Sequence, residues 1–194
     1  MAGTAATSTS LGHDYHPIER TAHEKARMSD TETRRIETLS WEDFGRASRQ
    51  LAQQVADSGY RPDLMVAIAR GGLPVGGALA YSLGMKNCAA INVKFYTGID
   101  ARLDVPVLLP PTPPLVDLAG LDVLLADDVA DSGETLAMVV DMLKGHVNAL
   151  RTVVLYHKPR SVIVPDYSWT TTSDWIHFPW DEPPVTPNTP PERA

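Results

Sequence analysis

Four short apolar runs recur along the middle of the chain. They lie at residues 63–69, 89–95, 121–126 and 151–157, and aliphatic residues dominate each of them. Uninterrupted runs of this length are typical of strands that are covered on both faces, as in a parallel sheet. The pattern therefore predicts a sheet whose strands are buried on both sides.

The segments between these runs carry apolar residues at helical spacing. The first begins after Ser40, a candidate N-cap, and ends at Gly59; two others span residues 75–83 and 136–143. Strands that alternate with helices in this order favour an α/β fold with a doubly wound parallel sheet.

Three segments depart from this alternation. Residues 1–37 contain only three large aliphatic side chains, which predicts a disordered N-terminal extension. Residues 97–118 contain five prolines and little periodicity, so we expect a flexible loop there. Residues 183–194 contain another five prolines and favour an extended, Pro-rich tail. The predicted domain accordingly spans residues 38–182.

The third apolar run leads into acidic and then small polar residues. Residues 123–135 read Val-Leu-Leu-Ala-Asp-Asp-Val-Ala-Asp-Ser-Gly-Glu-Thr. Asp127 and Asp128 follow the run, at the end of a strand where ligands of open α/β sheets bind. The turn at 131–135 combines a glycine with two hydroxyls before a helix, whose free N–H groups and dipole favour phosphate. The stretch predicts a site for a phosphorylated sugar.

These thirteen residues resemble the signature of the type I phosphoribosyltransferases, which bind 5-phosphoribosyl-1-pyrophosphate (PRPP). The resemblance implies that Asp127 and Asp128 hold the ribose hydroxyls and that the turn holds the 5′-phosphate. It also implies that Asp131 is the catalytic acid/base, which takes the N7 proton of a purine. The turn consists of Asp131, Ser132, Gly133, Glu134 and Thr135.

A glycine turn follows the first apolar run as well. Its glycines allow the backbone to approach an anion closely, and Arg70 adds a positive charge at the strand end. Alone, such a turn is more often only a tight connection between a strand and a helix. In the resembled family this segment is the pyrophosphate loop, so we expect Arg70, Gly71 and Gly72 to bind PRPP.

The residues after the last apolar run resemble bacterial xanthine-guanine phosphoribosyltransferases. These are the pair Lys158-Pro159 and the segment 175–181, Trp-Ile-His-Phe-Pro-Trp-Asp. The resemblance implies that Lys158 donates to a purine 6-oxygen, Trp175 stacks on the base and the Ile176 main chain contacts the 2-position. Two other interpretations stay open: Lys158 as an exposed charge, and 175–181 as an edge strand whose tryptophans cap the core.

Composition narrows the range of partners. The formal net charge is −7 and the pI is near 5.3. A protein that binds nucleic acid usually carries a net positive charge, so this acidic composition argues against that function. No stretch reaches the roughly 18 consecutive apolar residues of a membrane span, and no export signal is recognisable. The single cysteine, Cys88, excludes an internal disulfide and is expected to be buried. We therefore expect a cytoplasmic protein that binds neither nucleic acid nor membrane.

The resemblance implies transfer of a phosphoribosyl group from PRPP to a 6-oxopurine base. Mg²⁺ is implied because the charge of the departing pyrophosphate must be neutralised, and hard carboxylate oxygens suit this ion. The expected metal carboxylates are Asp127, Asp128 and Asp181. Two alternatives remain: a regulator that binds PRPP or nucleotide without turnover, and a transferase for a different base. The choice among hypoxanthine, guanine and xanthine stays open, and the family resemblance implies a homo-oligomer.

Overall fold

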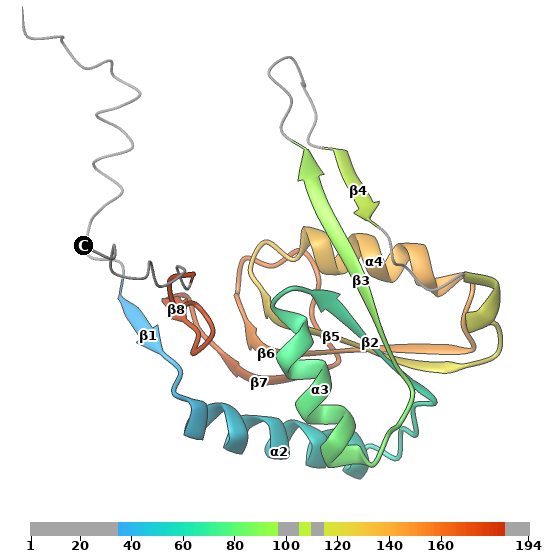
Figure 1. The fold of residues 1–194 in the computed structure, drawn as a ribbon, viewed down its shortest axis with the longest axis horizontal. Coiled ribbons are helices and arrows are strands. Elements are labelled where there is room, and N and C mark those ends of the chain that lie inside the picture. Colours follow the sequence, from blue (N-terminus) through green and yellow to red (C-terminus); the bar gives the residue numbers. More distant parts are fainter. Residues whose placement is uncertain (1–34, 97–104, 110–114, 185–194) are drawn as a thin grey trace, which may run out of the picture. The chain divides into compact units, whose positions relative to one another are not determined.

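The computed structural model describes residues 35–96, 105–109 and 115–184 (Figure 1). All elements within these ranges belong to one compact unit, Ile36–Ala194. The strands are β1 (Ile36–Thr38), β2 (Leu64–Ala69), β3 (Cys88–Tyr96), β4 (Val105–Leu109), β5 (Asp122–Ala130), β6 (Ala149–His157), β7 (Tyr167–Thr171) and β8 (Trp175–His177). The helices are α2 (Trp41–Asp57), α3 (Gly72–Leu83) and α4 (Glu134–Lys144), with a 3-10 turn at Leu115–Leu118.

The predicted α/β doubly wound sheet is confirmed. Strands of the main sheet follow the order β4-β3-β2-β5-β6-β7, in which every pair is parallel except β3 and β4. Helices α2 and α3 pack on one face of the sheet and α4 packs on the other (Figure 1). The carboxyl ends of β2, β5 and β6 consequently meet at one edge of the sheet.

Neighbouring residues of β5 show why its apolar run is uninterrupted. Leu124 packs in the core beneath α2 and α3, whereas Leu125 packs in the core beneath α4. Both are completely buried. Because successive side chains of a strand point to opposite faces, a strand with a helix layer on each side requires apolar residues at every position.

β5 extends further than the apolar run predicts. Asp127 and Asp128 lie within the strand, which continues to Ala130 because its pairing with β6 continues: Asp127 pairs with Val154 and Ala130 with His157. Its polar part was not recognised in the sequence because these positions face the site instead of a helix layer. The acid pair is therefore held by the hydrogen bonds of a sheet and not by a loop.

The segment 97–118, expected to be one flexible loop, contains the strand β4. This strand pairs antiparallel with β3 and forms an edge of the sheet. The sequence did not predict this strand because it contains Pro106. A proline is nevertheless compatible with an edge strand, because no neighbouring strand needs its missing N–H on the outer side. Residues 97–104 and 110–114 of the expected loop lie outside the described residues.

A second, two-stranded sheet joins the two ends of the domain. Ile36 and Glu37, which the sequence assigned to the N-terminal extension, form β1 and pair in parallel with β8. Residues 1–34 of that extension and 185–194 of the expected Pro-rich tail lie outside the described part of the chain. The pairing supports β8, which carries Trp175 and Ile176.

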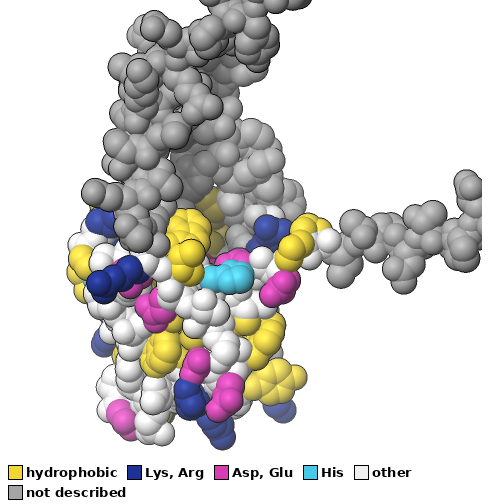
Figure 2. Space-filling model, turned by 90° about the vertical axis from the view of Figure 1, so that its left-hand side faces the viewer, with side chains coloured by type: hydrophobic (Ala, Val, Ile, Leu, Met, Phe, Trp, Pro, Cys, Tyr) yellow, Lys and Arg dark blue, Asp and Glu magenta, His cyan; other side chains and the backbone are white. Residues whose placement is uncertain are grey.

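Surface features complete the fold. Cys88 is exposed and not buried as expected, because it is the first residue of β3. Figure 2 views the side on which β1 and β8 lie, where hydrophobic and acidic side chains are interspersed. Among the described residues, no helix is long and apolar enough to cross a membrane.

Candidate active site

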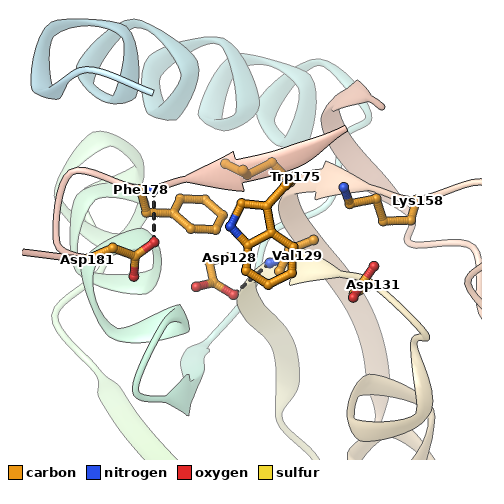
Figure 3. Close-up of a pocket in the computed structure, with 8 residues that line it drawn as sticks. Asp128, Val129, Asp131, Lys158, Trp175, Phe178 and Asp181 are labelled. Carbon is orange, nitrogen blue, oxygen red and sulfur yellow. Dashed lines mark hydrogen bonds between the residues drawn. The ribbon is translucent and has the colours of Figure 1, made fainter. Parts of the chain in front are cut away.

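A cavity of about 230 Å³ opens at the carboxyl ends of β5 and β6, beneath β8 (Figure 3). It gathers six of the residues expected from the sequence and adds two others. In Figure 3, Lys158 and Asp131 lie at one end of the cavity and Asp181 lies at the other, with Trp175 between them. The lining residues are Asp128, Val129, Asp131, Lys158, Trp175, Ile176, Phe178 and Asp181.

A larger cavity of about 650 Å³ adjoins the first one. The two cavities share Asp128 and Asp181, so these carboxylates lie between them. Arg70 and Gly71, from the predicted pyrophosphate loop, line only the larger cavity. Its other lining residues are Leu73, Pro74, Trp180, Glu182 and Pro184. The site thus has a compartment on the β2 side, lined by Arg70 and three carboxylates, and a compartment with an aromatic wall on the β6 side.

The acid pair is buried and locked by backbone hydrogen bonds. Asp127 is 9% exposed, and its Oδ1 accepts from the Asp128 N–H at 2.9 Å. Oδ1 of Asp128 accepts from the Val129 N–H at 2.7 Å. Burial raises the pKa of Asp127 well above its usual range; burial, with the negative charge of Asp181 adding to it, raises the pKa of Asp128 to about 6. A cation at this position would favour the ionised carboxylates.

Stability is expected to respond to pH through this pair. The folded chain keeps protons on Asp127 and Asp128 that the unfolded chain releases near pH 4. The free energy of unfolding therefore falls as the pH rises from about 4 through about 6. Asp127→Asn should flatten this dependence and raise the free energy of unfolding at about pH 7, as measured by urea unfolding at several pH values. Asp141→Asn, at an exposed position, is the control. If the free energy of unfolding depended on pH equally in both variants, this expectation would be wrong.

The two glycines of the predicted pyrophosphate loop pack against β5. A Cβ atom on Gly71 would overlap the Asp128 carboxyl group, and one on Gly72 would lie 2.5 Å from the Ala126 carbonyl oxygen. The Ala69–Arg70 peptide bond that precedes them is cis. A side chain at either position would therefore displace the end of β5. Close packing thus explains the two glycines, in addition to the close approach of an anion that was inferred from the sequence.

The predicted phosphate turn forms the start of α4. Gly133 adopts a positive φ of 78°, and a Cβ there would overlap the Ser161 hydroxyl. The Glu134 N–H donates to Ser132 Oγ at 3.4 Å. The first N–H groups of any helix have no intrahelical acceptors, so those of the first turn of α4 can bind a ligand. Glu134 and Thr135 are thus the first two residues of a helix whose positive end faces outward from the strand edge, as a phosphate site requires.

Lys158 and Asp131 each have a partner within the protein. Lys158 is 5% exposed, and its Nζ donates to the backbone oxygen of Asp174. Oδ1 of Asp131 accepts from Arg160, with Nε at 3.1 Å and Nη2 at 2.5 Å. Burial lowers the pKa of Lys158, while the nearby negative charge of Asp131 acts in the opposite direction. The interpretation of Lys158 as a solvent-exposed charge is therefore wrong.

The two tryptophans of segment 175–181 have different roles. Trp180 stacks on Phe178 at 5.0 Å with an interplanar angle of 8°, and it meets Phe44 edge-on. The core-capping interpretation therefore fits Trp180. Trp175 is 51% exposed and lines the smaller cavity, where its indole offers a flat surface (Figure 3).

One edge of β8 faces away from its partner strand β1. The Leu39 N–H donates to the His177 carbonyl at 3.0 Å, so the polar backbone groups of His177 face the β1 side. Alternate residues of a strand present these groups to opposite edges, which places the N–H and C=O of Ile176 at the other edge. That edge has no neighbouring strand among the described residues.

The expected metal carboxylates do not form a metal cage by themselves. Within residues 35–96, 105–109 and 115–184, no group of three or more His, Cys, Asp or Glu side chains is arranged to hold a metal ion. Oδ2 of Asp181 accepts from the Phe178 N–H at 2.9 Å, which closes the turn after β8. Asp127 likewise uses Oδ1 for a backbone N–H.

Several site residues escaped the sequence analysis. Val129 and Phe178 line the cavity from positions next to recognised motifs, and Asp174 holds Lys158 through its backbone. Arg160 forms an ion pair with Asp131, which lines the cavity. The only signal for Arg160 in the sequence was its place directly after the Lys158-Pro159 pair, and an arginine there is equally compatible with a solvent-exposed turn.

The fold and the arrangement of the site define a phosphoribosyltransferase. Residues 37–186 match the phosphoribosyl transferase domain, so the chain belongs to the phosphoribosyltransferase family. A xanthine-guanine phosphoribosyltransferase of Idiomarina loihiensis is 30% identical over 146 residues, 74% of this chain and 85% of that protein. The enzyme of the same name from Gluconobacter oxydans is 30% identical over 150 residues, 76% of this chain and 86% of that protein.

A solved structure agrees with these sequence relatives. The crystal structure of a purine phosphoribosyltransferase from Pyrococcus horikoshii is 36% identical and superposes with a TM-score of 0.69. The match covers 79% of this chain and 99% of that chain. The predictions of the family and of its fold are thereby confirmed.

Proposed function

We propose that the protein transfers the 5-phosphoribosyl group of PRPP to a 6-oxopurine base, hypoxanthine, guanine or xanthine. The products are the nucleoside 5′-monophosphate and pyrophosphate. One observation carries this proposal: Lys158, Asp131 and Trp175 line a single cavity. An ammonium donor, a carboxylate acceptor and an aromatic face correspond to the 6-oxygen, the N7 proton and the flat face of a 6-oxopurine.

Base recognition would use one side chain and one stretch of backbone. The Lys158 ammonium, held in place by the Asp174 carbonyl, donates to the 6-oxygen. The backbone groups of Ile176 contact the 2-substituent, because they face the unpaired edge of β8 and Ile176 lines the cavity. Trp175 covers the face of the base. Backbone recognition at the 2-position explains why the residue types alone do not discriminate among the three bases.

PRPP would extend from this cavity to the larger one. The start of α4, with the hydroxyls of Ser132 and Thr135, binds the 5′-phosphate. The ribose hydroxyls hydrogen-bond to Asp127 and Asp128, and Arg70 with its glycine loop binds the pyrophosphate in the larger cavity. The three parts of PRPP thereby follow the strand ends from β5 to β2.

The reaction proceeds by displacement at the anomeric carbon. N9 of the base forms a bond to this carbon, and the bond to the pyrophosphate oxygen breaks, with its electron pair leaving on pyrophosphate. Asp131 accepts the proton from N7, so the base becomes neutral as the new bond forms. Most of the acceleration then comes from holding both substrates in line and from balancing charge.

Mg²⁺ fits the residues that border both cavities. Asp128 and Asp181 present hard carboxylate oxygens there, and the negative charge of Asp181 acts on Asp128. These two residues would hold the ion together with oxygens of PRPP, because the protein alone supplies too few ligands. The ion would neutralise charge on the departing pyrophosphate.

Pyrophosphate release with separate bases tests this function. PRPP and Mg²⁺ are supplied with hypoxanthine, guanine, xanthine, adenine or uracil. We expect turnover with at least one 6-oxopurine and roughly 10⁴-fold slower turnover with adenine, because its 6-amino group leaves Lys158 without an acceptor. Preference for adenine or uracil would refute the base assignment. Binding of PRPP without turnover on any base would instead support the regulator alternative.

We also propose that the chain is a homo-oligomer that associates through α3. This helix contains no charged residue, and near its C-terminal end it exposes Tyr81 by 92%. A helix with an apolar outer face usually packs against another surface. Sedimentation should show that Tyr81→Lys dissociates the oligomer, whereas Val164→Lys, at an apolar loop position that is 76% exposed, leaves it intact.

A further inference from the structure

The Asp131 carboxylate is held from one side by a single arginine. Two N–H groups of Arg160, Nε and Nη2, converge on Oδ1 at 3.1 Å and 2.5 Å. No hydrogen bond reaches Oδ2 from the described part of the chain. Because a carboxylate bound through one oxygen keeps the other for a second partner, this geometry leaves Oδ2 to a ligand in the cavity.

Arg160 is presented by a well-defined turn. Pro159 occupies the second position of a turn closed by the Ser161 N–H, which donates to the Lys158 carbonyl at 3.0 Å. The next residue, Val162, donates its N–H to the Ser132 carbonyl at 2.8 Å. The turn is thus tied both to the end of β6 and to the phosphate turn, which fixes the base of the arginine side chain.

The stability of the folded protein does not explain why Arg160 pairs with Asp131. The side chain of Arg160 is 60% exposed and that of Asp131 is 41% exposed, and exposed ion pairs contribute little to folding. The position of the pair beside Lys158 is more informative. The charges of Asp131 and Arg160 both act on Lys158, in opposite directions, so the three groups form one electrostatic cluster. Asp174 and Glu37 also face Lys158.

This cluster offers Asp131 two possible partners. Without Arg160, the Asp131 carboxylate could pair with the Lys158 ammonium, which lines the same cavity and interacts with its charge, and direct pairing would remove both groups from the base. A purine needs them separately, one as a donor to its 6-oxygen and one as an acceptor from N7. Arg160, which lines neither of the two cavities, compensates the charge of Asp131 and so makes pairing of Asp131 with Lys158 less favourable.

We propose that Arg160 is a positioning residue, which holds Oδ1 of Asp131 so that Oδ2 meets N7 and Lys158 stays available for the 6-oxygen. The inference rests on the proposed function, because it assigns Arg160 a role in binding the base. Arg160 itself lines neither of the two cavities proposed to hold the base and PRPP.

Steady-state kinetics of Arg160→Ala test the proposal. We expect KM for the base to rise about 10- to 100-fold, the worth of one charge-assisted hydrogen bond, while KM for PRPP stays within about twofold. Arg160→Lys should restore part of the affinity, because an ammonium keeps the charge but loses the paired donors. Arg46→Ala is the matched control: Arg46 is 63% exposed and pairs with carboxylates on α2, so both KM values should match the parent.

A double-mutant cycle decides whether Arg160 acts through Asp131. In the Asp131→Asn background, Arg160→Ala should cause a much smaller loss than in the parent, because no carboxylate remains to be oriented toward N7. Equal losses in both backgrounds, or equal increases in the two KM values, would overturn the inference while leaving the function intact. Absence of turnover in the parent chain with every base would refute the proposed function and this inference together.

Discussion

Asp131→Asn is expected to lower kcat/KM for the 6-oxopurine by about 10²- to 10⁴-fold, the usual contribution of a general base. Asparagine has the size of aspartate and can still accept one hydrogen bond from Arg160, but it cannot take the N7 proton. The loss should therefore appear in kcat and in KM for the base, with the fold and PRPP binding preserved. The measurement is pyrophosphate release at saturating PRPP with varied base.

The control for this variant is Asp141→Asn. Asp141 is exposed on α4, the helix that begins at the phosphate turn, and it lines neither cavity. The substitution Asp141→Asn removes the same charge from the same region of the protein, and this variant should retain the kcat of the parent protein. If Asp131→Asn kept the kcat of this control, another group would have to accept the proton, and the assignment of the base would be wrong.

Gly71→Ala is expected to reduce kcat/KM for PRPP by about 10²-fold, the usual effect of displacing a positioned group by about 1 Å. The new methyl group would overlap the Asp128 carboxyl, which is part of a paired strand and has little freedom to yield. Either the pyrophosphate loop or the carboxylate must then move. Because both contact PRPP in the proposed complex, the loss should appear mainly in KM for PRPP.

Gly45→Ala is the matched control for the glycine substitution. Gly45 lies on the exposed side of α2, and a Cβ there meets no atom within 4 Å. Alanine at this position should stabilise the helix by up to about 1 kcal/mol and leave both KM values unchanged. A parent-like KM for PRPP in Gly71→Ala would show that the loop adapts freely and that the close packing on Asp128 has no functional role.

The predictions from sequence succeeded where a local pattern reports a local requirement. Buried strands of a doubly wound sheet need apolar residues on both faces, so β2, β3, β5 and β6 were recognisable from their runs. The start of α4 was recognisable because a phosphate turn needs glycine and small hydroxyl residues in a particular order. The apolar run of a buried strand and the residue order of a phosphate turn are both local patterns, because each involves only neighbouring residues of the chain.

Three elements escaped because long-range pairing decides them. β4 carries a proline, β1 is only three residues long, and β7 contains polar residues; each is a strand because a neighbouring strand offers it hydrogen bonds. The polar end of β5 belongs to the same class, since β6 continues alongside it. Strand propensity alone does not reveal a partner that lies far away in the sequence.

The sequence by itself determined the α/β architecture, the family and most of the residues that line the two cavities. Only the tertiary structure decided what each of these residues contacts. It brought Arg160 onto Asp131, buried Lys158 beneath β8, and divided the roles of Trp175 and Trp180 between the cavity and the core. Such contacts join residues whose distance in space depends on how whole strands and turns pack, and no pattern of neighbouring residue types encodes that distance.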